Sequence, residues 1–122
     1  MITQAAFQVP PLKERKRIPV KTNHAIAEHI AEKFNPEKII LFGSHACGTP
    51  TAWSDVDLLV VMDTPKGELE TAVAISESLP TLTFRVDIIA CSKEVIEKRK
   101  KLGDWFLIDE TEKGKVLYER TD

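Results

Sequence analysis

Short apolar runs alternate with helix-like segments along this chain, and that alternation limits the fold more than any other feature. Strand-like runs cover residues 38–42, 56–62, 83–91 and 115–119. Helical spacing of apolar residues starts after Thr22 or Asn23 as N-cap and stops at Asn35-Pro36, and it recurs over 66–79 and over 93–102 behind Ser92. We therefore predict an α/β (α+β) fold, a small mixed β-sheet with helices packed on one face. Asp104 can cap one more helix through Ile108.

The first 21 residues differ from the rest of the chain. They contain Pro10, Pro11 and Pro19, and the stretch Lys13–Lys21 is basic. Proline spacing and charge disfavour helix and strand here, so we predict a flexible basic N-terminal arm over 1–21 and one domain over 22–122. The arm is either a solvated tail or a contact for phosphate groups.

Bulk composition excludes several classes of protein. The 122 residues carry 17 Lys+Arg against 19 Asp+Glu, a net charge of -2, which argues against nucleic-acid binding through general charge. Apolar runs are too short to span a membrane, no secretory pattern opens the chain, and the two cysteines fit reduced thiols. We expect a cytoplasmic location. A chain of this length has room for a single core, so we expect part of any active site to come from a partner.

Three aspartates stand out within or beside the apolar strands. Asp55 and Asp57 are two apart, so their side chains point to the same face, and Asp87 interrupts a later strand. A charge in an apolar strand is costly unless it is paired. One interpretation is a site that binds a cation. The other is structural: Asp55 is a turn residue, Asp57 is solvated at a sheet edge, and Asp87 pairs with Arg85 or a lysine.

If the two strands are neighbours, the three carboxylates lie within about 6 Å of one another, where each like-charge pair costs about 3 kcal/mol at an effective dielectric constant near 20. A divalent cation would cancel that repulsion, and Mg²⁺ prefers carboxylate oxygens together with water and substrate phosphates. Two such ions about 3.5 to 4 Å apart would support in-line attack at phosphorus.

Gly43-Ser44 directly follows the first apolar strand. Glycine lets backbone N–H groups approach an anion, and a serine hydroxyl can donate to phosphate, although a Gly-Ser turn alone is unspecific. The whole string LFGSHACGTPTAWSDVDLLVV resembles the signature of the DNA polymerase beta-like nucleotidyltransferase superfamily. That signature is Gly-Ser, a spacer of about ten residues, Asp-x-Asp on a strand and a third carboxylate on a later strand.

Within that superfamily the chain is most similar to the minimal nucleotidyltransferases, many of which are antitoxins of HEPN-domain toxins. The resemblance implies a polymerase beta-like nucleotidyltransferase domain over 22–122, in which Gly43 and Ser44 bind the nucleotide. It also implies that Asp55, Asp57 and Asp87 are catalytic and ligate two Mg²⁺ ions, with Asp87 helping to deprotonate the acceptor. The implied reaction is transfer of AMP from ATP to a hydroxyl of a partner protein, a HEPN-domain toxin.

One position departs from the family pattern. Family loops often carry an arginine where this chain has Cys47. Loss of that guanidinium leaves an alternative open, a catalytically degenerate module that neutralises a partner by binding it. A second alternative is nucleotide transfer to a small molecule, as in aminoglycoside-modifying relatives. The pattern leaves the oligomeric state open, a homo-oligomer included.

Overall fold

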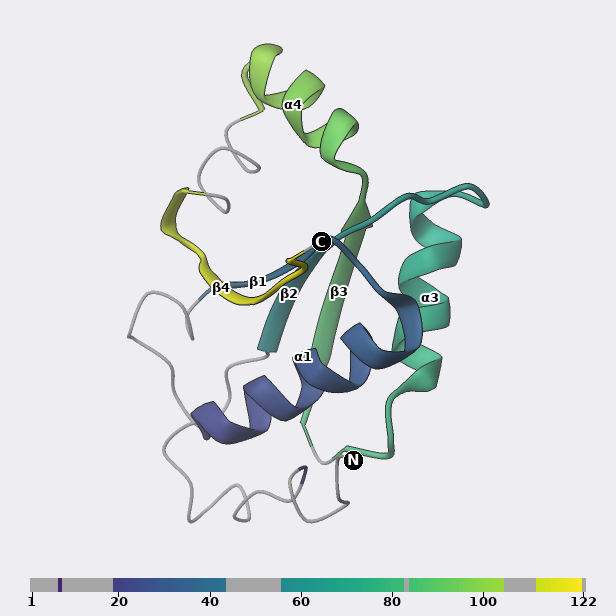
Figure 1. Ribbon diagram of the computed structural model, residues 1–122, viewed down its shortest axis with the longest axis vertical. Coiled ribbons are helices and arrows are strands. Elements are labelled where there is room, and N and C mark those ends of the chain that lie inside the picture. Colours follow the sequence, from purple (N-terminus) through teal and green to yellow (C-terminus); the bar gives the residue numbers. More distant parts are fainter. Residues whose placement is uncertain (1–6, 8–18, 44–55, 83, 105–111, 122) are drawn as a thin grey trace.

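The computed structural model of the chain describes residues 7, 19–43, 56–82, 84–104 and 112–121 (Figure 1). The elements follow in the order α1 (Val20–Phe34), β1 (Lys38–Phe42), β2 (Val56–Val61), α3 (Glu68–Ser78), β3 (Val86–Cys91), α4 (Lys93–Lys101) and β4 (Lys115–Glu119). The predicted α/β class is confirmed, and the predicted bounds of β1 and β4 agree with the structure. The helix expected after Asp104 falls on 105–111, outside the described residues.

The sheet is mixed, with strand order β3-β2-β1-β4. β1 runs antiparallel to both β2 and β4, whereas β2 and β3 are parallel. Parallel neighbours need a crossover connection, which α3 supplies between β2 and β3. This crossover places β2 in the interior of the sheet, flanked on both sides by hydrogen-bonded strands.

One face of the sheet, here called the first face, is apolar and covered by two helices. Figure 1 shows α1 and α3 on the same side of the strands. Alternate residues of the strands point toward these helices and are buried against Ile26, Ile30 and Ile75. These strand residues are Ile39, Leu41, Val56, Leu58, Val60 and Ala90. The first face therefore carries the main hydrophobic core.

The opposite face, here called the second face, is covered differently. A smaller cluster there joins Ile40, Phe42, Leu59, Val61 and Cys91 to Ile96 of α4. Helices α1 and α3 thus share one face as predicted, whereas α4 packs on the opposite face and differs from the predicted arrangement of all helices on one face. The reason is local, because Ser92 alone separates the end of β3 from the start of α4. Within the described ranges, no helix is long and apolar enough to cross a membrane.

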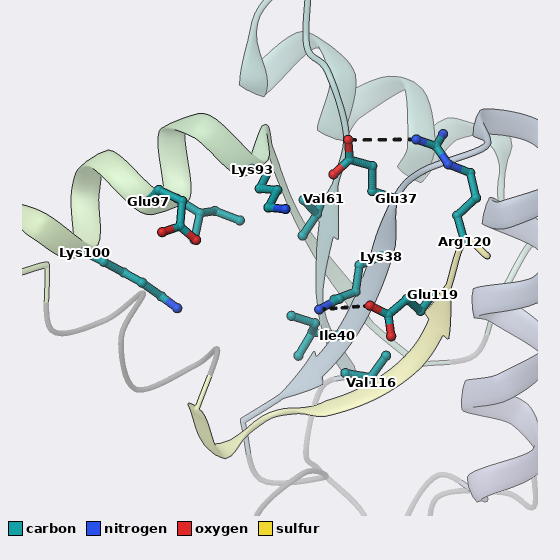
Figure 2. Close-up of a pocket in the computed structure, with 11 residues that line it drawn as sticks. Glu37, Lys38, Ile40, Val61, Lys93, Glu97, Lys100, Val116, Glu119 and Arg120 are labelled. Atoms are coloured by element: carbon teal, nitrogen blue, oxygen red, sulfur yellow. Dashed lines mark ion pairs between the residues drawn. The ribbon is translucent and has the colours of Figure 1, made fainter. Parts of the chain in front are cut away.

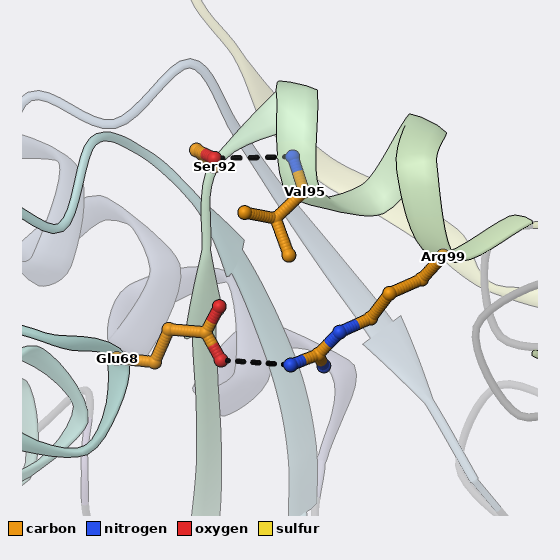
Figure 3. A network of polar contacts seen from close by, with 4 residues as sticks. All are labelled: Glu68, Ser92, Val95 and Arg99. Atoms are coloured by element: carbon orange, nitrogen blue, oxygen red, sulfur yellow. Dashed lines mark hydrogen bonds and ion pairs between the residues drawn. The ribbon is translucent and has the colours of Figure 1, made fainter.

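Two polar contacts hold α4 in place (Figure 3). The Ser92 hydroxyl accepts a hydrogen bond from the Val95 backbone N–H at 3.2 Å, which confirms Ser92 as the N-cap. Near the other end of the helix, the Arg99 guanidinium lies 3.3 Å from a carboxylate oxygen of Glu68 at the start of α3. The Arg99–Glu68 pair ties a second-face helix to a first-face helix around the end of β3.

The start of α1 corrects one prediction. The N-cap is Pro19, whose carbonyl accepts from the N–H groups of Thr22 and Asn23, so both predicted caps lie inside the helix. Their side chains are buried, and among the described residues they have no hydrogen-bond partner. Burial of this turn therefore outweighs the usual preference of Thr and Asn for the cap position. The predicted stop is confirmed, because Asn35 ends the helix in the left-handed conformation.

Within the range predicted as an arm, the structure describes Phe7 and residues 19–21. Phe7 is buried in the first-face core and meets His29 edge-on, with ring centroids 6.0 Å apart. His29 Nε2 in turn donates to the Ser78 carbonyl at 2.8 Å, which links α1 to α3. Helix α1 begins at Val20, so the folded domain starts slightly before the boundary expected at residue 22.

Candidate active site at one end of the sheet

The parallel register of β2 and β3 places Asp57 directly beside Asp87. Neighbouring strands lie about 4.8 Å apart, so the two carboxylates start from adjacent backbone positions. Leu59 and Ile89 of the same strands belong to the second-face cluster, so alternation puts both aspartates on the second face. Two of the three predicted carboxylates therefore share one end of that face.

Gly43 packs directly against Asp57. It follows β1, whose Phe42 is the register partner of Asp57, and its backbone is left-handed at φ 74°. A Cβ atom at this position would overlap the Asp57 carboxylate oxygen Oδ2. Both the backbone conformation and the contact thus require glycine here. Gly43 of the Gly-Ser motif and Asp57 of the Asp-x-Asp motif therefore lie in contact.

The charge on Asp87 is balanced by Arg85 from the same segment. Arg85 Nε lies 2.9 Å from Asp87 Oδ1, and the two side chains are 74% and 39% exposed. This contact confirms one part of the structural interpretation, the pairing of Asp87 with Arg85. The other part is wrong for Asp57, because β2 is an interior strand and not a sheet edge. Like-charge repulsion between the aspartates is thereby offset by a solvent-accessible ion pair.

The rest of the predicted site lies outside the described residues. Asp55, Ser44 and Cys47 fall within 44–55, so their predicted roles in metal and nucleotide binding stay predictions. In the described part of the chain, no three His, Cys, Asp or Glu side chains form a group that could hold a metal ion. The described pair still fits a hard divalent cation, because Asp57 and Asp87 offer carboxylate oxygens from neighbouring strands.

A pocket of about 520 Å³ lies elsewhere on the second face, between α4 and the strands β1 and β4 (Figure 2). It is lined by Lys38 and Val61, which are register partners at the end of the sheet away from Asp57. Lys38 and Val61 lie four residues of strand from Phe42 and Asp57, about 13 Å, and Ile40 of the lining lies two residues from Phe42. Neither Asp57 nor Asp87 lines the pocket.

Charges of both signs line this pocket. Lys38 pairs with Glu119 at 3.4 Å, and Arg120 lies 3.9 Å from Glu37 (Figure 2). We place the chemistry at the aspartate pair, because two like charges meet there on neighbouring strands. Sequence reasoning did not find the pocket, since its lining comes from segments far apart in the chain. The only sequence signal was the basic character of 93–101.

Cys91 ends β3 on the second face and is fully buried. Burial raises the pKa of its thiol to about 11, with a smaller contribution from the nearby Glu68 carboxylate and an opposing one from Arg99. A thiol with so high a pKa stays protonated near neutral pH and is a poor nucleophile. Cys91 is thus a packing residue and not a reactive group of the site.

Comparisons with known proteins bear on the family and the fold. Residues 24–118 match the sequence profile of the nucleotidyltransferase domain family. No curated protein matches the chain. A crystal structure of a Sulfolobus solfataricus protein, provisionally named a nucleotidyltransferase, is similar in fold, with a TM-score of 0.55 and 20% sequence identity. The alignment covers 80% of this chain and 78% of that one.

Proposed function

Because the chain belongs to the nucleotidyltransferase domain family, we propose that it transfers a nucleoside monophosphate, AMP from ATP, to a hydroxyl of a partner protein. One observation carries this proposal: the register of β2 and β3 sets Asp57 beside Asp87, with the Gly43 backbone packed on Asp57. A paired acid beside a glycine turn is the arrangement that phosphoryl chemistry with a divalent cation uses.

In the proposed reaction, the acceptor oxygen bonds to the α-phosphorus of ATP while the bond from that phosphorus to the bridging oxygen breaks and pyrophosphate leaves. Asp57 and Asp87, together with Asp55, would hold Mg²⁺, which polarises the phosphate and stabilises the charge on the leaving group. The Asp87 carboxylate is the proposed acceptor of the hydroxyl proton. It is suited to that role because its side chain is accessible to a substrate, at 39% exposure.

Gly43 is the proposed anchor for the distal phosphates, together with Ser44. Its positive φ turns the chain sharply at the end of β1, next to the carboxylates. Without a side chain, it allows a phosphate oxygen to approach the backbone N–H groups of the turn. A nucleotide bound there would have its phosphates beside Asp57.

The proposed acceptor is a helical HEPN-domain toxin, for which this chain would act as antitoxin. The proposal is supported by the family to which residues 24–118 belong and by the resemblance of the Gly43–Asp57 string to minimal nucleotidyltransferases. Modification of the partner by AMP would add a negative charge and a bulky group to its surface, which changes the contacts that surface can make.

Label transfer tests the proposed activity. The full chain, α-labelled ATP, Mg²⁺ and the protein encoded by the adjoining reading frame are incubated together, and the label on the partner is measured. We expect labelling by the wild type, at least a hundredfold less labelling by Asp57→Asn, and unchanged labelling by the exposed control Asp63→Asn. Equal labelling by wild type and Asp57→Asn would overturn the proposal.

A second candidate function is a binding module without catalysis. The Arg85–Asp87 pair favours it, because the charge of one proposed ligand is already balanced within the chain. In that case Asp57→Ala and Asp87→Ala still form the complex with the partner and still neutralise it. A variant that keeps the complex but loses neutralisation excludes the binding module.

A further inference from the structure

The proposed reaction leaves the pocket between α4 and the strands β1 and β4 without a role. Its volume of about 520 Å³ lies within the range of sites that hold small organic molecules, about 300–1,000 Å³. A stable contact with another protein needs a larger surface, about 800 Å² on each partner. The size of the pocket therefore favours a small ligand over a polypeptide.

The pocket has an apolar floor between anchored walls. The N-cap and the ion pair described above hold α4, and the sheet forms the opposite wall (Figure 3). Ile40 and Val61 of the sheet and Ile96 of α4 line the pocket and are almost fully buried. Val116 of β4 lines it as well, and its side chain is 51% exposed. An apolar group bound here would cover this open surface.

Charged side chains surround this floor, with a surplus of positive charge. Lys38 is paired with Glu119 at 3.4 Å. Arg120 lies 3.9 Å from Glu37. The charged residues of the lining outside these two pairs all come from α4, and they are Lys93, Glu97 and Lys100. Two ammonium groups and one carboxylate thus leave a net positive charge on the helical wall.

The two lysines of α4 are placed to act together. Lys93 and Lys100 are seven residues apart, so they lie on one side of the helix about 10 Å from each other along its axis. Figure 2 shows both side chains extending from α4 toward the strands. In the part of the chain that the structure describes, neither ammonium group takes part in an ion pair. Glu97 lies between them and can neutralise only one of them at a time.

We propose that this pocket is a binding site for a small organic anion, one that joins an apolar group to a carboxylate or phosphate. The apolar group packs on Ile40, Val61 and Val116, and the acidic group accepts hydrogen bonds from Lys93 and Lys100. Neither aspartate of the acid pair lines the pocket. The inference therefore goes beyond the proposed function and does not depend on it.

This arrangement predicts selectivity by charge. An anion gains both from the burial of its apolar group and from charge-assisted hydrogen bonds to the lysines. A neutral molecule of the same shape gains only from burial. Removal of the two lysines should thus weaken the binding of the anion and leave the neutral molecule almost unaffected.

Fluorescence titration of the full chain at about 0.15 M salt tests this inference. The probes are anilinonaphthalene sulfonate, an aromatic anion, and phenylnaphthylamine, which has the same rings without the sulfonate. For the double variant Lys93→Gln/Lys100→Gln, we expect the anionic probe to bind three- to tenfold more weakly, because each exposed charge contributes modestly. The neutral probe should bind within twofold of its wild-type affinity. Unchanged affinity for the anionic probe would overturn the inference.

The matched control is Lys98→Gln/Lys101→Gln. It removes the same charge from exposed positions of the same helix that do not line the pocket. Both probes should bind within twofold of wild type, because salt screens exposed charges beyond about 8 Å. Equal weakening in the two double variants would mean general attraction to a basic helix, and it would overturn the assignment of the pocket.

Nuclear magnetic resonance locates the bound probe. The anionic probe should shift the methyl signals of Ile40 and Val116, which line the pocket, and leave those of Ile30 and Ile75 in the first-face core unchanged. Shifts in both sets would indicate unspecific binding to loosely packed protein, and shifts in neither set would place the probe elsewhere. Either result would overturn the inference.

Discussion

The two faces of the sheet are built on different principles. The first face is apolar along the described strands and is covered by α1 and α3. The second face is apolar where α4 packs on the strands. At its other end this face carries Asp57 and Asp87. The same strands serve both, because alternate residues point to opposite sides. The main core and the acid pair are thus separated by residue parity within each strand.

The difference also explains how a charged pair is tolerated in an interior strand. Val56 and Leu58 flank Asp57 and are fully buried on the first face. Burial of these neighbours on the first face holds β2 in register whether or not the aspartates are paired with other charges. The second face of the same strand can therefore carry charged residues.

The largest expected effect compares consecutive residues of β2, Leu58 on the first face and Leu59 on the second. Leu58→Ala should lower the free energy of unfolding by about 3–5 kcal/mol, because two helices hold the cavity open. Leu59→Ala should lower it by about 2–3 kcal/mol, because its neighbours Ile40 and Val61 border an open pocket and can relax. Urea denaturation measures both values. Equal losses would show that the two faces are packed equally tightly.

The next effect compares two glycines with similar backbone angles, Gly43 at φ 74° and Gly103 at φ 82°. A Cβ at Gly103 meets nothing within 4 Å, whereas a Cβ at Gly43 meets the Asp57 carboxylate. Gly103→Ala should cost about 1–2 kcal/mol of unfolding free energy from the backbone alone. Gly43→Ala should cost about 2–4 kcal/mol, because Asp57 must also move.

Metal binding separates the two glycine variants further. Displacement of Asp57 should weaken Mn²⁺ binding by Gly43→Ala at least tenfold, while Gly103→Ala binds as the wild type does. If Gly43→Ala retains full Mn²⁺ affinity, the contact between Gly43 and Asp57 has no bearing on the site.

The buried thiol of Cys91, near α4, predicts that the stability of the fold depends on pH. The pKa of Cys91 rises from 9.0 to about 11 on burial, so the folded state keeps the proton that the unfolded chain releases between these values. The protonated thiol therefore contributes stability that is complete below pH 9 and is lost as the pH rises toward 11, roughly 2–3 kcal/mol in all. Urea unfolding of wild type and Cys91→Ala under reducing conditions isolates this contribution. A difference between them that stays constant from pH 8 to 11 would contradict it.

Sequence patterns predicted the strands well and the arrangement of helices less well. Lys38–Phe42 and Lys115–Glu119 are short β-branched runs between turn residues, and their bounds in the structure are the predicted ones. The spacing of apolar residues in α4 did not predict which face of the sheet the helix covers, because Ile96 is its only buried residue. The short connection after β3 determines that face. The start of α1 was missed because Thr22 and Asn23 are good caps in isolation.

The sequence predicted which residues form the site better than it predicted how they are arranged in space. Asp57 and Asp87 are far apart in sequence, and their contact depends on β2 and β3 being parallel neighbours in register. The motif indicated that they work together, whereas the strand order that unites them comes from the crossover through α3. Arg85 was foreseen as one partner of Asp87, because residues two apart in an extended segment share a side.

The smallest effect tests how much α4 contributes to the second face. Ser92 caps this helix through its bond to the Val95 N–H, so Ser92→Ala should lower the free energy of unfolding by about 1 kcal/mol, and Ser92→Asp should restore it. The control Ser76→Ala, at an exposed position inside α3, should change stability by less than about 0.5 kcal/mol. Both are measured by urea denaturation. If Ser92→Ala costs nothing, α4 can fray at its start without loss of the core, and the second face would depend on its strands alone.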